Sequence, residues 1–438
     1  MKEKFLHFGT RLIRHELVSG SVYIFLGFLL ASFLGFLVNL FLARNLSSSD
    51  YGIYASLLSL FTLASIPTQS IIPIVVRFAT DFFAKSELDK ASNFYFKVFR
   101  FVFVLSLLIF LAFITLSTPI ENFLHLDNFW YVFLTGLSVS FSYLAIINVA
   151  FLQSLLKFSF VGFSYILNGA ARLAITVVLV YLGFKVFGAL IAIIFAILAP
   201  FLFQFIPLRF LFKQKRKIET KISGKEIIDY ALPTTITTLS LMSLTSTDVI
   251  LVKHFFSAET AGLYGGLSLI GKVIFYFTGP IPSVMFPLLI RRHNLGQNFH
   301  SLFYLALILV IVPSIAITII YFIFPQFIVS LFLGGGSYLK IASLLGLFGI
   351  FLTIFSLINV FVNFFLSLKK TNIYLFVLFA AISQIVLINF FHSSFTQVIF
   401  DSLFVSLGLL IILFIFYIIN YKNLVKTREK FTISPGLN

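Results

Sequence analysis

The chain is a succession of long apolar stretches, and this pattern restricts its fold more than any other feature of the sequence. The hydrocarbon core of a bilayer is about 30 Å thick, so a helix needs about 20 residues to cross it. Only 11% of the residues are charged, whereas soluble domains carry about 25%, and the mean hydropathy is +1.08. The sequence therefore predicts an all-α polytopic membrane protein with about 12 transmembrane helices. These are expected at residues 18–43, 52–76, 100–118, 130–152, 160–182, 186–208, 227–252, 262–290, 301–324, 341–367, 372–391 and 397–420.

The positions of lysine and arginine predict the orientation. If the N-terminus is cytoplasmic, 25 of the 31 lysines and arginines fall in cytoplasmic segments. Cytoplasmic loops of membrane proteins are enriched in these residues, so we expect both termini to be cytoplasmic. Residues 1–17 are expected to form a short amphipathic helix on the anionic inner leaflet or a disordered basic tag. The net charge of +16 follows from this distribution, and the absence of a basic soluble domain argues against a nucleic-acid partner.

Two stretches about 210 residues apart resemble each other. In Leu42–Tyr54 and in Leu251–Tyr264, an apolar segment ends in a cation, a short polar turn carries an acid, and Gly-x-Tyr opens the next apolar segment. With six predicted helices on each side of a basic linker, this weak repeat predicts two parallel six-helix halves, residues 1–217 and 218–438. Paired halves of this kind are typical of transporters, in which the substrate pathway lies between the repeats.

The sequence carries no signature of catalysis. It contains no cysteine, and its seven histidines are nowhere spaced as metal ligands. It also contains no nucleophile–base–acid set, no P-loop and no dinucleotide-binding glycine motif. We therefore expect neither an enzyme nor a protein that depends on a metal or a cofactor.

Charged residues within the predicted membrane helices are the candidate functional residues. A charge near the bilayer centre costs about 2.5–3.5 kcal/mol on insertion scales, so it should face a water-filled cavity or a partner of opposite charge. Arg172 and Lys272 are candidates for a cationic cavity that receives an anionic group. Alternatively, each forms a structural ion pair with a membrane acid. The two membrane acids are Asp248 and Asp401, which are assigned either this structural role or a role in coupling ion binding to transport.

Prolines concentrate in the second predicted helix of each half. A proline inside a helix removes a backbone donor and clashes with the preceding turn, so these helices should bend or break. Broken helices at corresponding positions of two repeats often mark the binding site of a transporter, although a static kink needed for packing is the alternative. The candidate hinge residues are Pro67, Pro73, Pro280, Pro282 and Pro287.

Several amide side chains also lie on the apolar helices. Such groups hydrogen-bond between neighbouring helices more often than they contact a ligand, and this structural role is the expectation here. The residues are Asn39, Gln69, Asn148, Asn168, Gln204, Asn359, Asn363 and Gln384.

A set of short motifs occurs in a characteristic order. The first half contains Arg44-x-Leu46 followed by Asp50-Tyr51-Gly52-Ile53-Tyr54. The second half contains Tyr230-Ala231-Leu232-Pro233, Asp248 with Lys253, Gly262-Leu263-Tyr264 and Met285-Phe286-Pro287. In this order the motifs resemble those of bacterial polysaccharide flippases, which belong to the multidrug/oligosaccharidyl-lipid/polysaccharide exporter (MOP) superfamily.

This resemblance implies a V-shaped bundle with a lateral cavity that works by alternating access. The implied function is to flip undecaprenyl-pyrophosphate-linked oligosaccharide repeat units, for lipopolysaccharide or capsule, across the cell (inner) membrane of a bacterium or archaeon. The implied partners are this lipid-linked substrate, membrane lipids and, from the same pathway, a polymerase and glycosyltransferases. Buried cations would offset the desolvation of the pyrophosphate. Arg44 and Arg77 therefore join Arg172 and Lys272 as candidate substrate-binding residues.

Two other functions stay open on the sequence. Cation-coupled multidrug antiporters of the same superfamily typically carry membrane-embedded acids in the N-terminal half, whereas the acids of this half all fall in predicted loops. A non-transporting scaffold of a glycan-synthesis complex is the second alternative. A major facilitator fold is disfavoured, because the loop Arg77–Lys85 lacks both glycines of the motif that is usual there.

Overall fold

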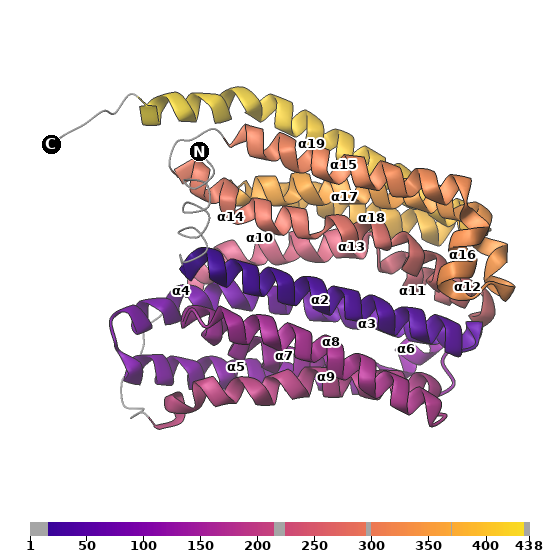
Figure 1. The fold of residues 1–438 in the computed structure, drawn as a ribbon, viewed down its shortest axis with the longest axis horizontal. Coiled ribbons are helices and arrows are strands. Elements are labelled where there is room, and N and C mark those ends of the chain that lie inside the picture. The colour runs from indigo at the N-terminus through magenta and orange to yellow at the C-terminus, as the bar shows by residue number, and fades with distance from the viewer. Residues whose placement is uncertain (1–15, 214–223, 295–298, 369, 433–438) are drawn as a thin grey trace, which may run out of the picture. The chain divides into compact units, whose positions relative to one another are not determined.

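The chain divides into two compact units, Met1–Ala231 and Leu232–Asn438. The computed structural model describes residues 16–213, 224–294, 299–368 and 370–432. Regular secondary structure in these described ranges is entirely helical (Figure 1). The sequence-based division after residue 217 stays a prediction because that position lies outside the described residues, as does nearly all of the expected amphipathic segment 1–17.

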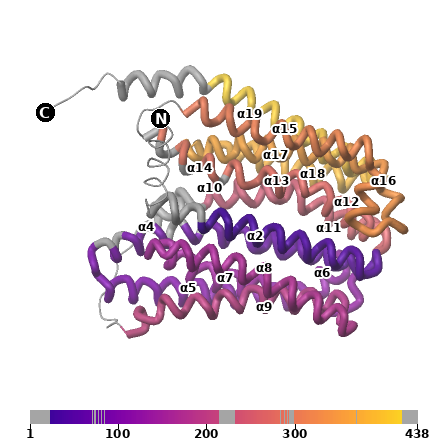
Figure 2. The backbone as a smooth tube through the Cα atoms, viewed as in Figure 1, coloured from indigo at the N-terminus to yellow at the C-terminus, as the bar shows by residue number. Residues whose placement is uncertain are grey.

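The first unit contributes six helical stretches that are long and apolar enough to cross a membrane. They form because each is an uninterrupted apolar run, in which a helix satisfies every backbone polar group internally. Figure 2 traces α2 in indigo beside α8, against which it packs. The elements are α2 (Glu16–Asn45), α3 (Ser48–Ser65), η1 (Ile66–Ser70), α4 (Ile71–Ala84), α5 (Leu88–Thr115), α6 (Ser117–Leu124), α7 (Phe129–Ser154), α8 (Phe158–Tyr181), α9 (Lys185–Leu208) and η2 (Arg209–Lys213).

The second unit contributes five further spans and one bent pair of helices, Leu232–Ser243 with Thr247–Phe255, which meet at 48°. Counting this pair as one span gives twelve in the described ranges, which confirms the predicted number and the all-α fold class. The elements are α10 (Gly224–Ser243), which belongs to this unit from Leu232 onward, α11 (Thr247–Phe255), α12 (Ala258–Gly271), α13 (Val273–Thr278), α14 (Pro280–Asn294), α15 (His300–Ile323), α16 (Pro325–Leu333), η3 (Gly336–Leu344), α17 (Leu345–Ser367), η4 (Thr371–Ile373), α18 (Tyr374–Phe390) and α19 (Phe395–Thr432).

The two units repeat the same order of elements. In each, a short helix follows the third span: α6 in the first unit and α16 in the second. Both short helices end at a residue in the left-handed conformation, His125 with φ 49° and Gly334 with φ 80°. This ending satisfies terminal carbonyl groups and turns the chain into the next span.

The repeated polar turns of the sequence are helix starts. The Ser47 hydroxyl caps α3 by accepting the Asp50 N–H at 3.1 Å, and the Ser257 hydroxyl caps α12 by accepting the Thr260 N–H at 3.4 Å. Each helix also has an acid in its first turn, where a negative charge is favoured by the helix dipole. The acid and the serine of the repeat therefore have a structural explanation.

The second span of each unit is broken. In the first unit α3 gives way to the 3-10 turn η1, which has Pro67 in its first turn. In the second unit the span is divided into α12, α13 and α14, with Pro280 at the start of α14. A tyrosine from a neighbouring helix binds a carbonyl beside each break: Tyr143 donates to Ala64 O at 3.0 Å, and Tyr321 donates to Ile270 O at 2.7 Å. Predicted prolines mark η1 and the start of α14, whereas the break between α12 and α13 at Lys272 has none. A hinge motion stays a prediction.

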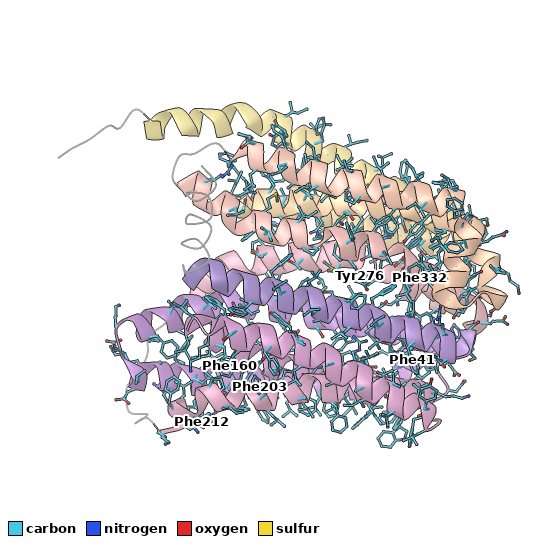
Figure 3. All side chains as sticks on the ribbon, viewed as in Figure 1. Phe41, Phe160, Phe203, Phe212, Tyr276 and Phe332 are labelled. Carbon is cyan, nitrogen blue, oxygen red and sulfur yellow. The ribbon has the colours of Figure 1, made fainter. Side chains whose placement is uncertain are left out.

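Aromatic rings and amide groups join the helices within each unit. Phe160 of α8 stacks on Phe203 of α9 with ring centroids 5.7 Å apart. Figure 3 labels both side chains. Asn168 donates to Ala196 O at 2.7 Å, and Gln384 donates to Leu244 O at 3.0 Å. These amides bond between helices, as expected for polar groups in an apolar bundle.

Candidate functional site

Arg172 belongs to a buried polar cluster of the first unit. It lies on α8, and its Nη2 donates to the Tyr54 hydroxyl of α3 at 2.6 Å. That hydroxyl donates in turn to Asn39 Oδ1 of α2 at 3.2 Å, and Asn39 Nδ2 donates to Gly35 O at 2.8 Å. Tyr54 is fully buried and Asn39 is buried. Three helices thus position the guanidinium through one hydroxyl.

The close packing of α2 on α8 makes this geometry possible. A Cβ added to Gly27 of α2 would lie 2.7 Å from the Cα of Gly162 on α8. A Cβ added to Gly169 would lie 3.2 Å from the Cα of Ala31. Small residues at such positions let two helix backbones approach closely in a membrane. Arg172, one turn beyond Gly169 on the same helix, is thereby brought to the α2–α3 pair.

No carboxylate of the described residues compensates the charge of Arg172. The side chain is half-buried, and its Nε is buried with no hydrogen-bond partner in the part of the chain that the structure describes. Among the described residues, its recorded hydrogen bond goes to the neutral Tyr54. A buried cation without a counter-ion is unfavourable unless an anion reaches it, so the ion-pair explanation of Arg172 finds no partner in the described residues.

Lys272 and Asp248 lie in a corresponding cluster of the second unit. Asp248 is at the start of α11 and is 1% exposed. Its Oδ2 accepts the Tyr264 hydroxyl of α12 at 2.9 Å, and its Oδ1 has no hydrogen-bond partner in the described part of the chain. The half-buried Lys272 is the residue at which α12 ends and α13 begins.

Lys272 acts on Asp248 through space. The opposite charges attract each other, yet no direct ion pair between them is found among the described residues, where such contacts extend to 4.0 Å. The structure therefore brings together Lys272 and one of the two predicted acids. The other acid, Asp401 on α19, is half-buried with its Oδ2 unpartnered in the described ranges.

The two clusters occupy equivalent positions of the sequence repeat. Asn39 lies five residues before Arg44, and Asp248 lies five residues before Lys253. Each bonds to the tyrosine of the following Gly-x-Tyr, with 15 residues separating the first pair and 16 the second. The one-residue difference equals the one-residue difference between the two copies of the repeat. The repeat therefore encodes one hydrogen bond twice, with an amide in the first unit and a carboxylate in the second.

In the described ranges, the hydrogen bonds of these two clusters involve none of the other predicted residues. Arg44 is exposed in the last turn of α2. Arg77 lies on α4, which follows η1, and its side chain is outside the described residues. Pro73 is in the first turn of α4, and Pro282 and Pro287 are in α14.

Asn39, Tyr54 and Tyr264 were not predicted as site residues. Polar groups of these types are common on membrane helices. Asn39 was expected to bond between helices, and Tyr54 and Tyr264 were noted only as the tyrosines of the repeated Gly-x-Tyr. The signal that could have identified them is the register of the repeat: Asn39 and Asp248 each lie five residues before the cation, and Tyr54 and Tyr264 lie ten and eleven residues after it.

Comparisons with known proteins agree with this fold. A family model described as polysaccharide biosynthesis protein matches residues 41–343. An uncharacterized membrane protein of Methanocaldococcus jannaschii is 26% identical over 301 residues, which are 64% of this chain and 69% of that protein.

Solved structures of transporters have a similar fold. An outward-facing multidrug resistance MATE family transporter of the MOP superfamily superposes with a TM-score of 0.64 at 14% identity, over 96% of this chain and 99% of that one. The MATE multidrug transporter DinF-BH gives 0.65 at 17% identity, over 93% and 96%. The eukaryotic MATE transporter AtDTX14 gives 0.65 at 12% identity, over 94% and 98%. Because the family model covers more than half of the chain, this multi-pass membrane protein belongs to the polysaccharide biosynthesis protein family, with the fold of the MOP superfamily, as its motifs predicted.

Proposed function

We propose that the protein is a flippase that moves undecaprenyl-pyrophosphate-linked oligosaccharide repeat units from the inner to the outer leaflet by alternating access. The observation that carries this proposal is Arg172, a half-buried cation on a membrane helix whose hydrogen bond goes to a neutral hydroxyl. Such a group suits a pyrophosphate, whose negative charge must be stabilised where water is scarce. Family membership in polysaccharide biosynthesis supports a glycan-linked substrate.

Lys272 supplies a second cation in the other half. Its neighbour Asp248 attracts it without a direct ion pair in the described ranges, so its ammonium group keeps donors for an anion. Arginine offers a planar fork to a phosphate, whereas lysine acts as a point charge. The two residues would therefore contribute differently to the affinity for the substrate.

Multidrug antiport is the second candidate, because solved structures of this fold are described as multidrug transporters. The acids that begin the first unit's described spans, Asp50 and Asp89, lie in first helical turns. The buried cluster of this unit holds Arg172 with the neutral Tyr54 and Asn39. A cationic drug would be repelled by this arginine, so the charge distribution favours an anionic substrate.

Transport in liposomes tests the proposal. Protein reconstituted with a lipid-linked pyrophosphoryl oligosaccharide should expose the sugar on the opposite leaflet, and Arg172→Ala should reduce this rate at least tenfold. Arg172→Lys should keep part of the activity, because charge survives while the planar fork is lost. Arg100→Ala is the matched control, since Arg100 is an exposed arginine on α5.

The alternatives give different results in the same liposomes. Uptake of a lipophilic cation with no movement of the oligosaccharide would indicate an antiporter. Movement of neither compound, in protein that is folded and inserted, would indicate a scaffold. Transport by Arg172→Ala at the rate of the unchanged protein would remove this residue from the mechanism.

A further inference from the structure

The second cluster has a feature that the first lacks, a group that can lose its charge. At the equivalent position of the repeat, Asn39 stays neutral at any physiological pH, whereas Asp248 is neutral or negative according to whether it binds a proton. The carboxyl is buried, and its Oδ1 is unpartnered among the described residues. Desolvation disfavours the ionised form of this buried carboxyl, and the charge of Lys272, the Tyr264 hydroxyl and backbone N–H groups at the start of α11 stabilise it.

Both groups lie at interruptions of their helices. Asp248 follows the 48° bend between α10 and α11, and Lys272 stands between α12 and α13. The Tyr321 hydroxyl binds Ile270 O at 2.7 Å, two residues before Lys272, and so fixes the backbone there. The Lys272 side chain is half-buried, and its ammonium is further from Asp248 than an ion pair allows. The ammonium can therefore turn from Asp248 toward a bound anion without unfolding either helix.

We propose that Asp248 and the pyrophosphate headgroup of the substrate compete for Lys272, so that proton binding at Asp248 releases this lysine to the anion. In the step itself the carboxylate takes up one proton and becomes a carboxylic acid, and the Tyr264 hydroxyl continues to donate to Oδ2. The net charge of the pair changes from zero to plus one. This inference rests on the proposed function, since it assigns Lys272 to the anion.

The surroundings of Asp248 favour a proton over a metal ion as its ligand. Within the described residues, the groups that act on this carboxylate are Lys272, the Tyr264 hydroxyl and the backbone N–H groups of Asp248 and Val249 at the start of α11. Further charged or titratable side chains of α11, α12 and α18 stand at helix ends: Lys253 and His254 at the end of α11, Glu259 at the start of α12, Tyr374 at the start of α18 and His392 after it. No cluster of three metal-binding side chains occurs in the described ranges, and the charge of Lys272 opposes a second cation.

Linkage predicts how the competition is observed. If a proton at Asp248 strengthens anion binding, then anion binding must cause proton uptake, because the coupling free energy is reciprocal. The dissociation constant should rise with pH, by at most about tenfold per pH unit for one proton. The probe is farnesyl pyrophosphate bound to the full-length protein in detergent, with proton uptake measured by calorimetry in buffers of different ionisation enthalpy.

The key variant is Asp248→Asn, which imitates the protonated acid. It should bind the probe at high pH as tightly as the unchanged protein does at low pH, and with less proton uptake. Asp401→Asn is the matched control, because it removes a membrane acid from another part of the same unit and should leave the pH dependence intact. The titration of the probe itself is the same for every variant, so the comparison isolates Asp248.

A second variant guards against a folding failure of Asp248→Asn. Tyr264→Phe keeps the acid but removes the hydrogen bond to the ionised form, and it should move the change in affinity to higher pH. An Asp248→Asn protein with the pH dependence and proton uptake of the unchanged protein overturns the inference, as does a Tyr264→Phe protein with an unmoved transition. An affinity that depends on sodium instead of pH also overturns it.

The proposed function fails in a distinguishable way. If Arg172→Ala and Lys272→Ala both bind the probe like the unchanged protein, the anion site itself is wrong. If both lose affinity while Asp248→Asn keeps its proton uptake, the anion site stands and only the competition is refuted.

Discussion

The Tyr54 hydroxyl is shared by three helices, since it belongs to α3, accepts from Arg172 of α8 and donates to Asn39 of α2. Tyr54→Phe should lower the transport rate by about tenfold or more, because it removes a hydrogen bond to a charged group, about 1.5–3 kcal/mol. Transport and thermal unfolding should be measured together. Tyr181→Phe is the control, because Tyr181 is an exposed tyrosine on α8, the helix that carries Arg172. Unchanged transport per folded molecule would show that Tyr54 is only structural.

At the residue scale, the sequence was informative where a residue type is rare in its setting. Charges at mid-membrane are costly, so Arg172 and Lys272 could be selected without a structure. The partners of Arg172 could not be selected in the same way, because Tyr54 and Asn39 are ordinary on apolar helices. The packing of α11 on α12 decides that Asp248, and not Asp401, lies near Lys272. The hydropathy of the sequence carries no information about this packing.

The contact between α2 and α8 is the element-scale feature that positions Arg172. Gly27→Leu should destabilise the protein by about 1–3 kcal/mol through overpacking, because the new side chain meets the backbone of Gly162. It should also reduce transport by moving α8 away from Tyr54. Gly35→Ala is the control on the same helix, since a Cβ there meets nothing within 4 Å. The two variants should be compared by thermal unfolding in detergent, and equal stability would refute the close contact.

The break between α12 and α13 should loosen when its tyrosine contact is removed. Tyr321→Phe leaves Ile270 O without this donor, and an unmade buried hydrogen bond costs about 1–3 kcal/mol. Amide hydrogen exchange should therefore become faster in α12 and α13 than in α17. A uniform change along the chain would instead indicate global destabilisation without a local hinge.

Element number was predictable from sequence, whereas element interruptions were not. The requirement for about 20 apolar residues per crossing gives the count directly. The predicted helix 262–290 is, however, three helices in the structure, and 227–252 is a bent pair. An apolar run continues across such a break, so its hydropathy is unchanged. The prolines indicated α14 and η1, but no residue of this type marks the breaks at Ser246 and Lys272.

At the scale of the whole molecule, each half contains six spans in the same order with a short helix after the third. This agreement extends the weak sequence repeat from two short segments to the succession of elements, and it explains why one hydrogen bond recurs in both halves. The halves differ at that bond, with an amide in one and a carboxylate in the other. The two halves therefore share their order of helices but differ in whether this position can bind a proton. This difference is expected if the second half is specialised for proton-linked binding.

The orientation in the membrane is a prediction for the whole chain. The protein has no native cysteine, so single cysteines can be introduced directly and labelled with an impermeant thiol reagent in whole cells. Cysteines at Ser48, Ser337 and Ser393 should be labelled, and one at Ser223 should not, because the basic segments are expected inside. Lys185 provides an internal check: it lies 3.7 Å from Asp50, at the same end of its unit as Ser48, so Lys185→Cys should be labelled too. Labelling at Ser223 with protection at Ser48 would reverse the orientation and with it the direction of transport.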